Sequence, residues 1–204
     1  MFARSITYSG NPNTLDDGIA FVRDEVMPAI TQMSGCVGMS LVIDRQSGRA
    51  IATSSWESKD HMRGSFDQLA SLRERGADIL GGAPTVDEWE VGLMHRDHRT
   101  ADGACCRISW GRTSDIDRAV EMFRSMVLPR MEEIDGFCSA SLLLDRDGGR
   151  TCGTFTFDSR AALEETRDRA AEMRARVTDQ AGIEFTDVGE FDLAMAHLRL
   201  PELV

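Results

Sequence analysis

The segment SLVIDRQSGR at residues 40–49 recurs 101 residues later as SLLLDRDGGR at residues 141–150. In each copy an apolar run ends in Asp-Arg, a short turn ends in Gly-Arg, and a second strand-like run follows. Two extended runs joined by a glycine-containing turn predict a β-hairpin. The chain therefore carries the hairpin twice, and any fold proposed for it has to account for an internal repeat.

The repeat continues on both sides of the hairpin. The 101-residue offset holds without a gap, and it aligns identical residues on both sides of the hairpin: Pro28 with Pro129, Gly35 with Gly136, and Ser58 with Ser159. Farther along the offset becomes 102, which aligns His95 with His197. We interpret the chain as two repeats, residues 1–98 and 103–204, joined by a short polar segment that ends at Gly103.

The first half of each repeat reads as a strand followed by a helix. Residues 4–8 alternate between apolar and polar types, which predicts the first strand of copy one. Capping boxes at Thr14–Asp17 and Ser114–Asp117 predict the start of the first helix in the two copies. Pro28 and Pro129 fall within the apolar stripe of that helix, so we expect a kink or an altered turn there.

The second half of each repeat is a hairpin, a helix and a strand. Ser58 and Ser159 stand where an N-cap of the second helix belongs, and residues 89–95 and 191–197 predict the last strand. The order β-α-β-β-α-β is the ferredoxin-like split motif, with both helices on one face of an antiparallel sheet. The other apolar face needs cover, so we expect an α+β fold in which two ferredoxin-like repeats form an intrachain pseudo-dimeric barrel.

The composition is that of an ordinary folded protein. Hydrophobic residues make up 42% and charged residues 28% of the 204 residues, close to the averages for globular proteins. The formal charge of -11 repels phosphate backbones and anionic lipids, so we expect neither nucleic acid nor a membrane as a partner. No apolar run reaches about 18 residues and no signal pattern opens the chain, which favours the cytoplasm.

The cysteines and the known catalytic motifs give little support for metal or cofactor chemistry. Adjacent residues of a strand point to opposite faces, so Cys105 and Cys106 do not form a pair of ligands, and no C-x-x-C spacing is present. The sequence also lacks a glycine-rich phosphate loop and a spaced metal-binding cluster. We therefore expect no metal and no cofactor.

A resemblance to a known family rests on the residues after the hairpin. The segment Ser54-Ser-Trp-Glu-Ser-Lys59, then a helix, then the strand around Trp89-Glu-Val91, resembles the antibiotic biosynthesis monooxygenase-like dimeric α+β barrels. The equivalent segment of copy two is Phe155-Thr-Phe-Asp-Ser-Arg160, in which Phe157 stands at the position of Trp56. The resemblance implies a ligand between sheet and helices or within the barrel. It also implies cofactor-free oxygenation of aromatic polyketides or quinols, or degradation of haem.

Two departures from the family pattern bear on the activity. Many members carry a histidine about nine residues after the tryptophan, where this chain has Ser65 and, in copy two, Thr166. By the same resemblance, haem-degrading members carry an asparagine on the first strand, and a tryptophan and a histidine after the tryptophan that follows the hairpin. Copy one has other residue types at those places: Ile6 or Thr7, Phe66 and Gly76. Haem degradation by the family's route is therefore not expected.

Five aromatic or histidine side chains are candidates for ligand contact. His95 and His197 occupy equivalent strand positions, and an imidazole there suits a base or a haem ligand. The alternative is that each histidine ends an edge strand in solvent. Trp56, Tyr8 and Trp110 could line an aromatic pocket, and the alternative for them is core packing.

Arg107 is the sixth candidate, because it falls within the first strand of copy two. The alternate positions of the same strand in copy one carry the small polar residues Ser5 and Thr7, so we expect Arg107 to face the interior. A buried guanidinium needs an anion, which is either a bound acid or a carboxylate of the protein. The equivalent residues Glu88 and Glu190 on the last strands are the natural protein partners.

Three functions remain open from the sequence. The first is a cofactor-independent monooxygenase acting on a small aromatic or polyketide-like substrate. The second is a barrel that binds a hydrophobic small molecule or haem without turnover, with the pocket of one repeat open and the other filled. The third is a structural protein. We expect the chain to work as a monomeric pseudo-dimer or as a homodimer of it, and an apolar cavity with polar groups at its end favours the first two functions.

Overall fold

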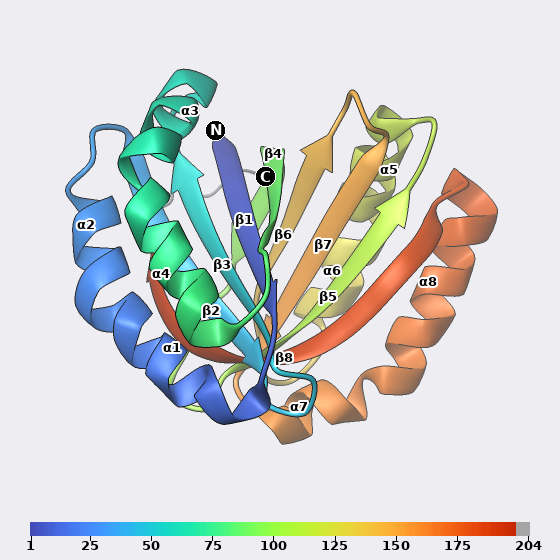
Figure 1. Ribbon diagram of the computed structural model, residues 1–204. Coiled ribbons are helices and arrows are strands. Elements are labelled where there is room, and N and C mark those ends of the chain that lie inside the picture. Colours follow the sequence, from blue (N-terminus) through green and yellow to red (C-terminus); the bar gives the residue numbers. More distant parts are fainter. Residues whose placement is uncertain (199–204) are drawn as a thin grey trace. The chain divides into compact units, whose positions relative to one another are not determined.

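The computed structural model describes residues 1–198 and has the predicted α+β architecture (Figure 1). The strands are β1 Phe2–Ser9, β2 Cys36–Asp44, β3 Arg49–Trp56, β4 Thr85–Arg96, β5 Cys105–Arg112, β6 Phe137–Asp145, β7 Arg150–Phe157 and β8 Glu184–Leu198. The helices are α1 Leu15–Phe21, α2 Met27–Thr31, α3 Lys59–Gln68, α4 Ala70–Leu80, α5 Ile116–Met122, α6 Leu128–Glu132, α7 Arg160–Glu165 and α8 Arg167–Ala181. Each repeat follows the predicted order, with its two helical regions broken into shorter pieces.

Hydrogen bonds join the eight strands in the closed order β1-β3-β2-β8-β5-β7-β6-β4. This is the strand order of an α+β barrel made from two ferredoxin-like repeats, so the predicted fold class is confirmed. The two hairpins at the centre of the repeats are antiparallel and in the same register, with Asp44 opposite Arg49 and Asp145 opposite Arg150. The repeated Asp-Arg and Gly-Arg segments thus close equivalent turns.

The compact units of the structure differ from the sequence repeats. The first unit contains Met1–Trp89 together with β8 from Leu193 onward, and the second contains Glu90–Asp192. Strands β4 and β8 therefore each begin in one unit and end in the other. This explains why they extend over 12 and 15 residues, beyond the predicted segments 89–95 and 191–197. The repeat boundaries inferred from sequence remain a proposal about the duplication.

Each unit has its own core between its sheet and its helices. In the first unit α1 to α4 pack against β1, β2 and β3, and the fully buried side chains include Leu15, Trp56 and Met62. In the second unit α5 to α8 pack against β5, β6 and β7, and the fully buried side chains include Phe157 and Leu163. The helices cover one face of the sheet in each unit, as the split motif predicts.

The second helical region begins at the predicted cap in both repeats. The Oγ of Ser58 accepts a hydrogen bond from the backbone N–H of His61, and the Oγ of Ser159 accepts one from the N–H of Ala162, each at 3.2 Å. Both serines have extended backbone angles, as an N-cap requires. The sequence predicts these caps because the bond depends only on residues three positions apart.

The capping boxes predicted for the first helix are wrong. A 3-10 turn at Pro12–Thr14 precedes α1, so Thr14 already has a turn conformation and makes no side-chain cap bond. In the second repeat Asp115, one residue after the predicted Ser114, caps α5 by accepting a bond from the N–H of Arg118 at 2.9 Å. A preceding turn shifts the cap, and the capping-box pattern does not contain that information.

Both prolines disturb their helix, as predicted. Residues Val22–Val26 and Phe123–Val127 form π-helical turns, and Pro28 and Pro129 are the second residues of the α-helices that follow. Proline lacks the N–H that closes an ordinary helical turn, and its ring clashes with the preceding turn. A wider turn placed directly before the proline relieves this conflict.

The close approach of α4 to β1 in the first unit predicts a specific coupling between Gly76 and Tyr8. A Cβ atom on Gly76 would lie 2.8 Å from the hydroxyl oxygen of Tyr8. We expect Gly76→Ala to destabilise the protein by about 1 kcal/mol, although alanine favours helices, because a rigid ring cannot move aside. Removing the hydroxyl with Tyr8→Phe should recover about 1 kcal/mol in the double variant. Urea unfolding of the wild type, the two single variants and the double variant measures this coupling. If the two substitutions change the free energy of unfolding additively, the predicted contact is contradicted.

Candidate functional site

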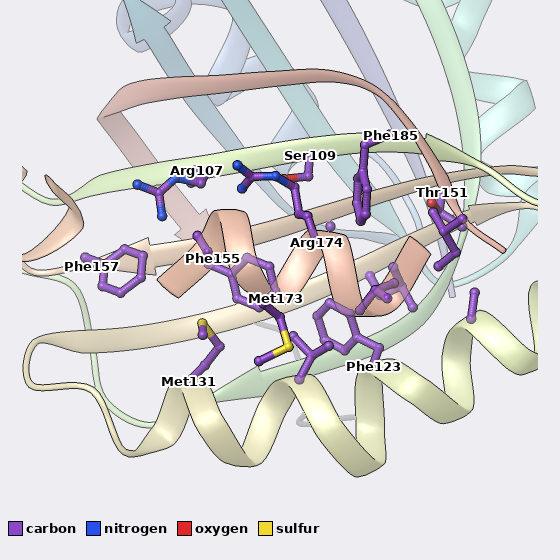
Figure 2. Close-up of a pocket in the computed structure, with 17 residues that line it drawn as sticks. Arg107, Ser109, Phe123, Met131, Thr151, Phe155, Phe157, Met173, Arg174 and Phe185 are labelled. Atoms are coloured by element: carbon purple, nitrogen blue, oxygen red, sulfur yellow. The ribbon is translucent and has the colours of Figure 1, made fainter. Parts of the chain in front are cut away.

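The second unit contains an apolar pocket between its sheet and its helices (Figure 2). The cavity has a volume of about 70 Å³ and is partly open. Four of the 17 residues that line it are polar: Arg107, Ser109, Thr151 and Arg174. Six of the other thirteen are phenylalanine or methionine: Phe123, Phe155, Phe157, Phe185, Met131 and Met173. This is the apolar cavity with a few polar groups that ligand sites usually present.

The sheet leaves space for the pocket where small residues lie on the face that points toward the helices. On β5, Arg107, Ser109 and Gly111 point to the same face, since every second residue of a strand does. Ser109 pairs with Gly153 of β7, so two small residues meet at the floor of the pocket. The ring of Phe155 stacks on Phe123 with centroids 5.4 Å apart and closes one wall.

The corresponding face of the first unit carries larger side chains. The pairing of β1 with β3 places Ile6 opposite Ala52, where the second unit has Ser109 opposite Gly153. Tyr8 stands at the position of Gly111 and is buried, with its hydroxyl donating a hydrogen bond to the carbonyl oxygen of Arg73 at 3.3 Å. At the two compared positions the sheet face of the first unit therefore carries more bulk than that of the second unit, where the pocket lies.

The buried Arg107 marks the polar end of the pocket. Its Nη2 lies 2.7 Å from Oε1 of Glu190, so the predicted ion pair with the last strand is confirmed. Its Nη1 donates to Oγ1 of Thr166 at 2.7 Å, and its Nη2 also donates to the carbonyl of Leu163 at 3.0 Å. The guanidinium thus joins β5 to β8 and to the break between α7 and α8.

The first unit contains the same arrangement around Arg4. Its Nη2 lies 2.8 Å from Oε1 of Glu88, and its Nη1 donates to Oγ of Ser65 at 3.2 Å. The counterpart of Arg107 is therefore Arg4, whereas the 101-residue offset aligns Arg107 with Ile6. The strand pairings show the reason, because the offset between the first strands is 103 residues and not 101.

Ser65 and Thr166 occupy the places where the resembled family often carries a histidine. Both hydroxyls accept a hydrogen bond from a buried arginine, and both donate to a carbonyl of the preceding turn. A hydroxyl offers no imidazole nitrogen that could accept a proton near neutral pH. These two residues position an arginine in this chain.

Opposing charges decide the ionisation of Glu190. Burial alone would raise the pKa of its carboxyl group, but hydrogen bonds from Arg167 and Arg107 and the charges of both outweigh burial and lower the pKa to about 2. Nε of Arg167 lies 3.2 Å from Oε1, and Nη2 lies 2.7 Å from Oε2. Glu190 is therefore an anion at every physiological pH.

Arg174 is a pocket residue that the sequence analysis missed. It extends from α8 toward the same side of the pocket as Arg107 and Ser109 (Figure 2). Burial lowers the pKa of its guanidinium, and the nearby charge of Arg107 lowers it further. A signal was present in the sequence, because Ala170, Met173 and Val177 form an apolar helical stripe that this arginine interrupts.

The predicted aromatic candidates lie in several places. Trp56 is fully buried in the core of the first unit, where its Nε1 donates to Oγ of Ser54 at 3.0 Å, and Tyr8 belongs to the same core. Trp110 on β5 is half-buried and meets the edge of the ring of Phe191 at 6.3 Å. The structure therefore places Trp56 and Tyr8 as the core-packing alternative describes. Ligand contact by the three aromatic residues stays a prediction.

The two histidines are not equivalent in their surroundings. His95 is mostly buried in the second unit, with Nε2 2.9 Å from Oε1 of Glu132 and its ring stacked on Phe137. His197 near the end of β8 is exposed. Neither histidine is among the residues that line the pocket of the second unit. Their proposed role as base or ligand stays a prediction.

A group of potential metal ligands lies away from the pocket in the second unit. One side-chain atom of each of His98, Cys138 and Asp158 lies within 4.8 Å of the others. These atoms already bond to one another, since Nε2 of His98 lies 3.0 Å and Sγ of Cys138 lies 3.1 Å from Oδ1 of Asp158. Burial raises the pKa of the Cys138 thiol to about 12, which keeps it protonated. The cluster is satisfied as a hydrogen-bonded group that holds the segment after β4.

Comparison with known proteins identifies close relatives. Protein Rv2557 of Mycobacterium tuberculosis is 50% identical over 206 residues, which cover 100% of this chain and 92% of the relative. Protein Rv2558 of the same organism is 48% identical over 207 residues, covering 100% of this chain and 88% of the relative. This chain belongs to their family. Both relatives are described as uncharacterized, and no family model matches the chain.

Solved structures define the fold of this family. A candidate monooxygenase from Fusobacterium nucleatum has a TM-score of 0.74 with 9% identity, covering 100% of this chain and 95% of that one. An anthrone oxidase-like protein has a TM-score of 0.68 with 11% identity, covering 99% and 94%. A ferredoxin-fold protein of Listeria monocytogenes related to antibiotic biosynthesis monooxygenases has a TM-score of 0.55 with 11% identity, covering 94% of each chain. The chain therefore has the monooxygenase-like dimeric α+β barrel fold. At these identities the likeness concerns the fold.

Among residues 1–198, no helix has the length and apolar character needed to span a bilayer.

The ionic contacts of Glu190 predict a pH-dependent stability. Glu190→Gln should lower the free energy of unfolding by roughly 2 to 3 kcal/mol at pH 7, because it leaves Arg107 buried without an anion. The pKa of Glu190 falls from an ordinary 4.5 to about 2 on folding, so its contribution is complete above pH 4.5 and disappears as the pH falls toward 2.

Urea unfolding of the wild type and of Glu190→Gln between pH 7 and pH 2.5 measures this contribution. The two curves should converge as the pH falls. Glu88→Gln is the matched control in the first unit and should lose less stability, since the Glu88 side chain is 34% exposed against 21% for Glu190. A loss that stays constant with pH would show that Glu190 acts by packing alone.

Proposed function

We propose that this protein is a cofactor-independent monooxygenase-like enzyme that acts on a small aromatic or polyketide-like molecule in the pocket of its second unit. The observation that carries the proposal is the aromatic-walled cavity with Arg107, Ser109 and Arg174 at its polar end. The fold shared with a candidate monooxygenase and an anthrone oxidase-like protein supports the same class of chemistry.

The proposed reaction needs an electron-rich substrate and dioxygen. A CH₂ group activated by neighbouring carbonyl and aromatic groups loses a proton, and the resulting anion transfers electrons to dioxygen. One oxygen atom becomes the new C=O group and the other leaves as water, so the substrate supplies every electron and no external reductant is needed. A guanidinium beside the pocket stabilises the anion and lowers the pKa of the substrate.

The cavity sets a limit on how a ring can enter. Its volume of about 70 Å³ is less than the roughly 150 Å³ of an engineered cavity that holds benzene. Side chains therefore move when an aromatic ligand binds. Met173 and Arg174 on α8 are long and unbranched, and such side chains change conformation at little cost. The phenylalanine walls, which stack on one another, are expected to stay in place.

Binding without turnover is the second candidate function. The same pocket holds a hydrophobic molecule in this case, and the copy with the bulkier Ile6 and Tyr8 serves as scaffold. Haem is one of the ligands considered for this binding function. The bulk difference between the two sheet faces favours one ligand per chain for both candidate functions.

Filling the pocket tests the proposal. Gly153→Val adds an isopropyl group to the floor, next to the ring of Phe123, which lies 3.5 Å from a Cβ at this position. Ala52→Val is the matched control at the equivalent position of β3 in the first unit. Oxygen uptake with a panel of anthrones and hydroquinones should occur with the wild type and the control, and fall at least 10-fold with Gly153→Val.

The outcomes separate the candidate functions. Oxygen uptake that survives in Gly153→Val would place the reaction elsewhere in the protein. A ligand-induced rise in melting temperature without oxygen uptake would support binding alone, and a Soret band on adding haem would identify haem as the ligand. Neither uptake nor a thermal shift with any compound would overturn the proposal and leave the structural alternative. Circular dichroism of both variants checks that they fold.

A further inference from the structure

The guanidinium of Arg174 stands at the polar end of the pocket without a partner of its own. Within residues 1–198 it makes neither a hydrogen bond nor an ion pair. It is half-buried, and Figure 2 shows it directed along the sheet beside Ser109 and toward Arg107. A cation that is partly removed from water and faces another cation raises the free energy of the empty pocket.

The carboxylate whose charge acts on Arg174, that of Glu190, is already shared by several other arginines. Glu190 bonds to Arg107 and Arg167, and Nη1 of Arg160 lies 3.8 Å from its Oε2. The charge of Glu190 also acts on Arg174, but burial together with the charge of Arg107 leaves the pKa of Arg174 lowered. The surplus of guanidinium groups at this end contrasts with a chain whose formal charge is -11.

The first repeat shows how the same arginine is held when it has a structural role. At the 101-residue offset the counterpart of Arg174 is Arg73. Nη1 of Arg73 donates to the carbonyl of Phe66 at 2.7 Å, and its guanidinium carbon lies 3.7 Å above the centre of the Phe66 ring. In the second repeat Arg167 replaces Phe66. The partner of the arginine has thus been replaced by a second cation.

We infer that Arg174 is the recognition residue for an anionic ligand, so that the pocket selects planar aromatic molecules that carry a carboxylate or an enolate oxygen. The apolar wall accepts the ring, and the guanidinium pairs with the oxygen anion, for which its planar donors are well suited. Ser109, which is buried at the same end, can donate one further hydrogen bond. This inference rests on the proposed function in one respect, that the pocket of the second unit is a ligand site.

Matched probes separate charge recognition from simple burial. 2-Naphthoate and 2-naphthamide have the same ring and nearly the same shape, but only the first is an anion at pH 7. Isothermal titration should show that the wild type binds 2-naphthoate about 10-fold more tightly than 2-naphthamide, as expected for one charge-assisted contact. Arg174→Met keeps a long flexible side chain without charge, and it should bind both probes with similar affinity.

Arg73→Met is the control variant, because it removes the equivalent arginine from the first unit. It should keep the 10-fold preference, although it loses the contacts with Phe66. Equal binding of the two probes by the wild type, or a preference that survives in Arg174→Met, would overturn the inference and leave the proposed pocket intact. If neither probe binds to the wild type, the pocket is not a site for aromatic ligands, and the inference fails together with the proposed site.

Discussion

A buried arginine on the first strand of each repeat is the contact on which the rest of the structure depends. Arg4 and Arg107 each reach a glutamate of the last strand and a hydroxyl of the second helical region. A guanidinium can be buried only when its charge and its donors are satisfied together. The first strand, the last strand and the second helical region are therefore held in one geometry, and the polar end of the pocket in the second unit forms around Arg107.

The two repeats keep this frame and differ in what they enclose. In the first unit Tyr8 fills the space against α4, and Arg73 lies over the ring of Phe66. In the second unit Gly111 and Arg167 stand at the places of Tyr8 and Phe66, and Arg167 adds charge. In the first unit, contacts within the protein account for the positions of Tyr8 and Arg73. The second unit has an unpaired charge beside a cavity, which is a cost without a ligand and a benefit with one.

The sequence predicts those features that depend on neighbouring residues or on obligatory partners. The hairpins, the serine caps and the pairing of Arg107 with Glu190 belong to this group. It does not predict features that depend on how strands pair. The offset of the first strands and the length of β8 follow from pairings that leave no local pattern. Arg174 differs from these features, because it interrupts an apolar helical stripe that can be read in the sequence. The ligand contacts proposed for His95 and His197 had no such obligatory partner to support them.

The passage of β4 and β8 from one compact unit into the other makes the two halves of the chain depend on each other. The later part of β4 pairs with β6, so the sheet of the second unit includes residues encoded in the first repeat. A fragment that ended between the repeats would leave a sheet edge without its neighbour, and exposed edges invite association with other chains. The two halves of this chain differ in sequence, yet each contributes a strand segment to the compact unit of the other, much as exchanged arms do in a domain-swapped dimer.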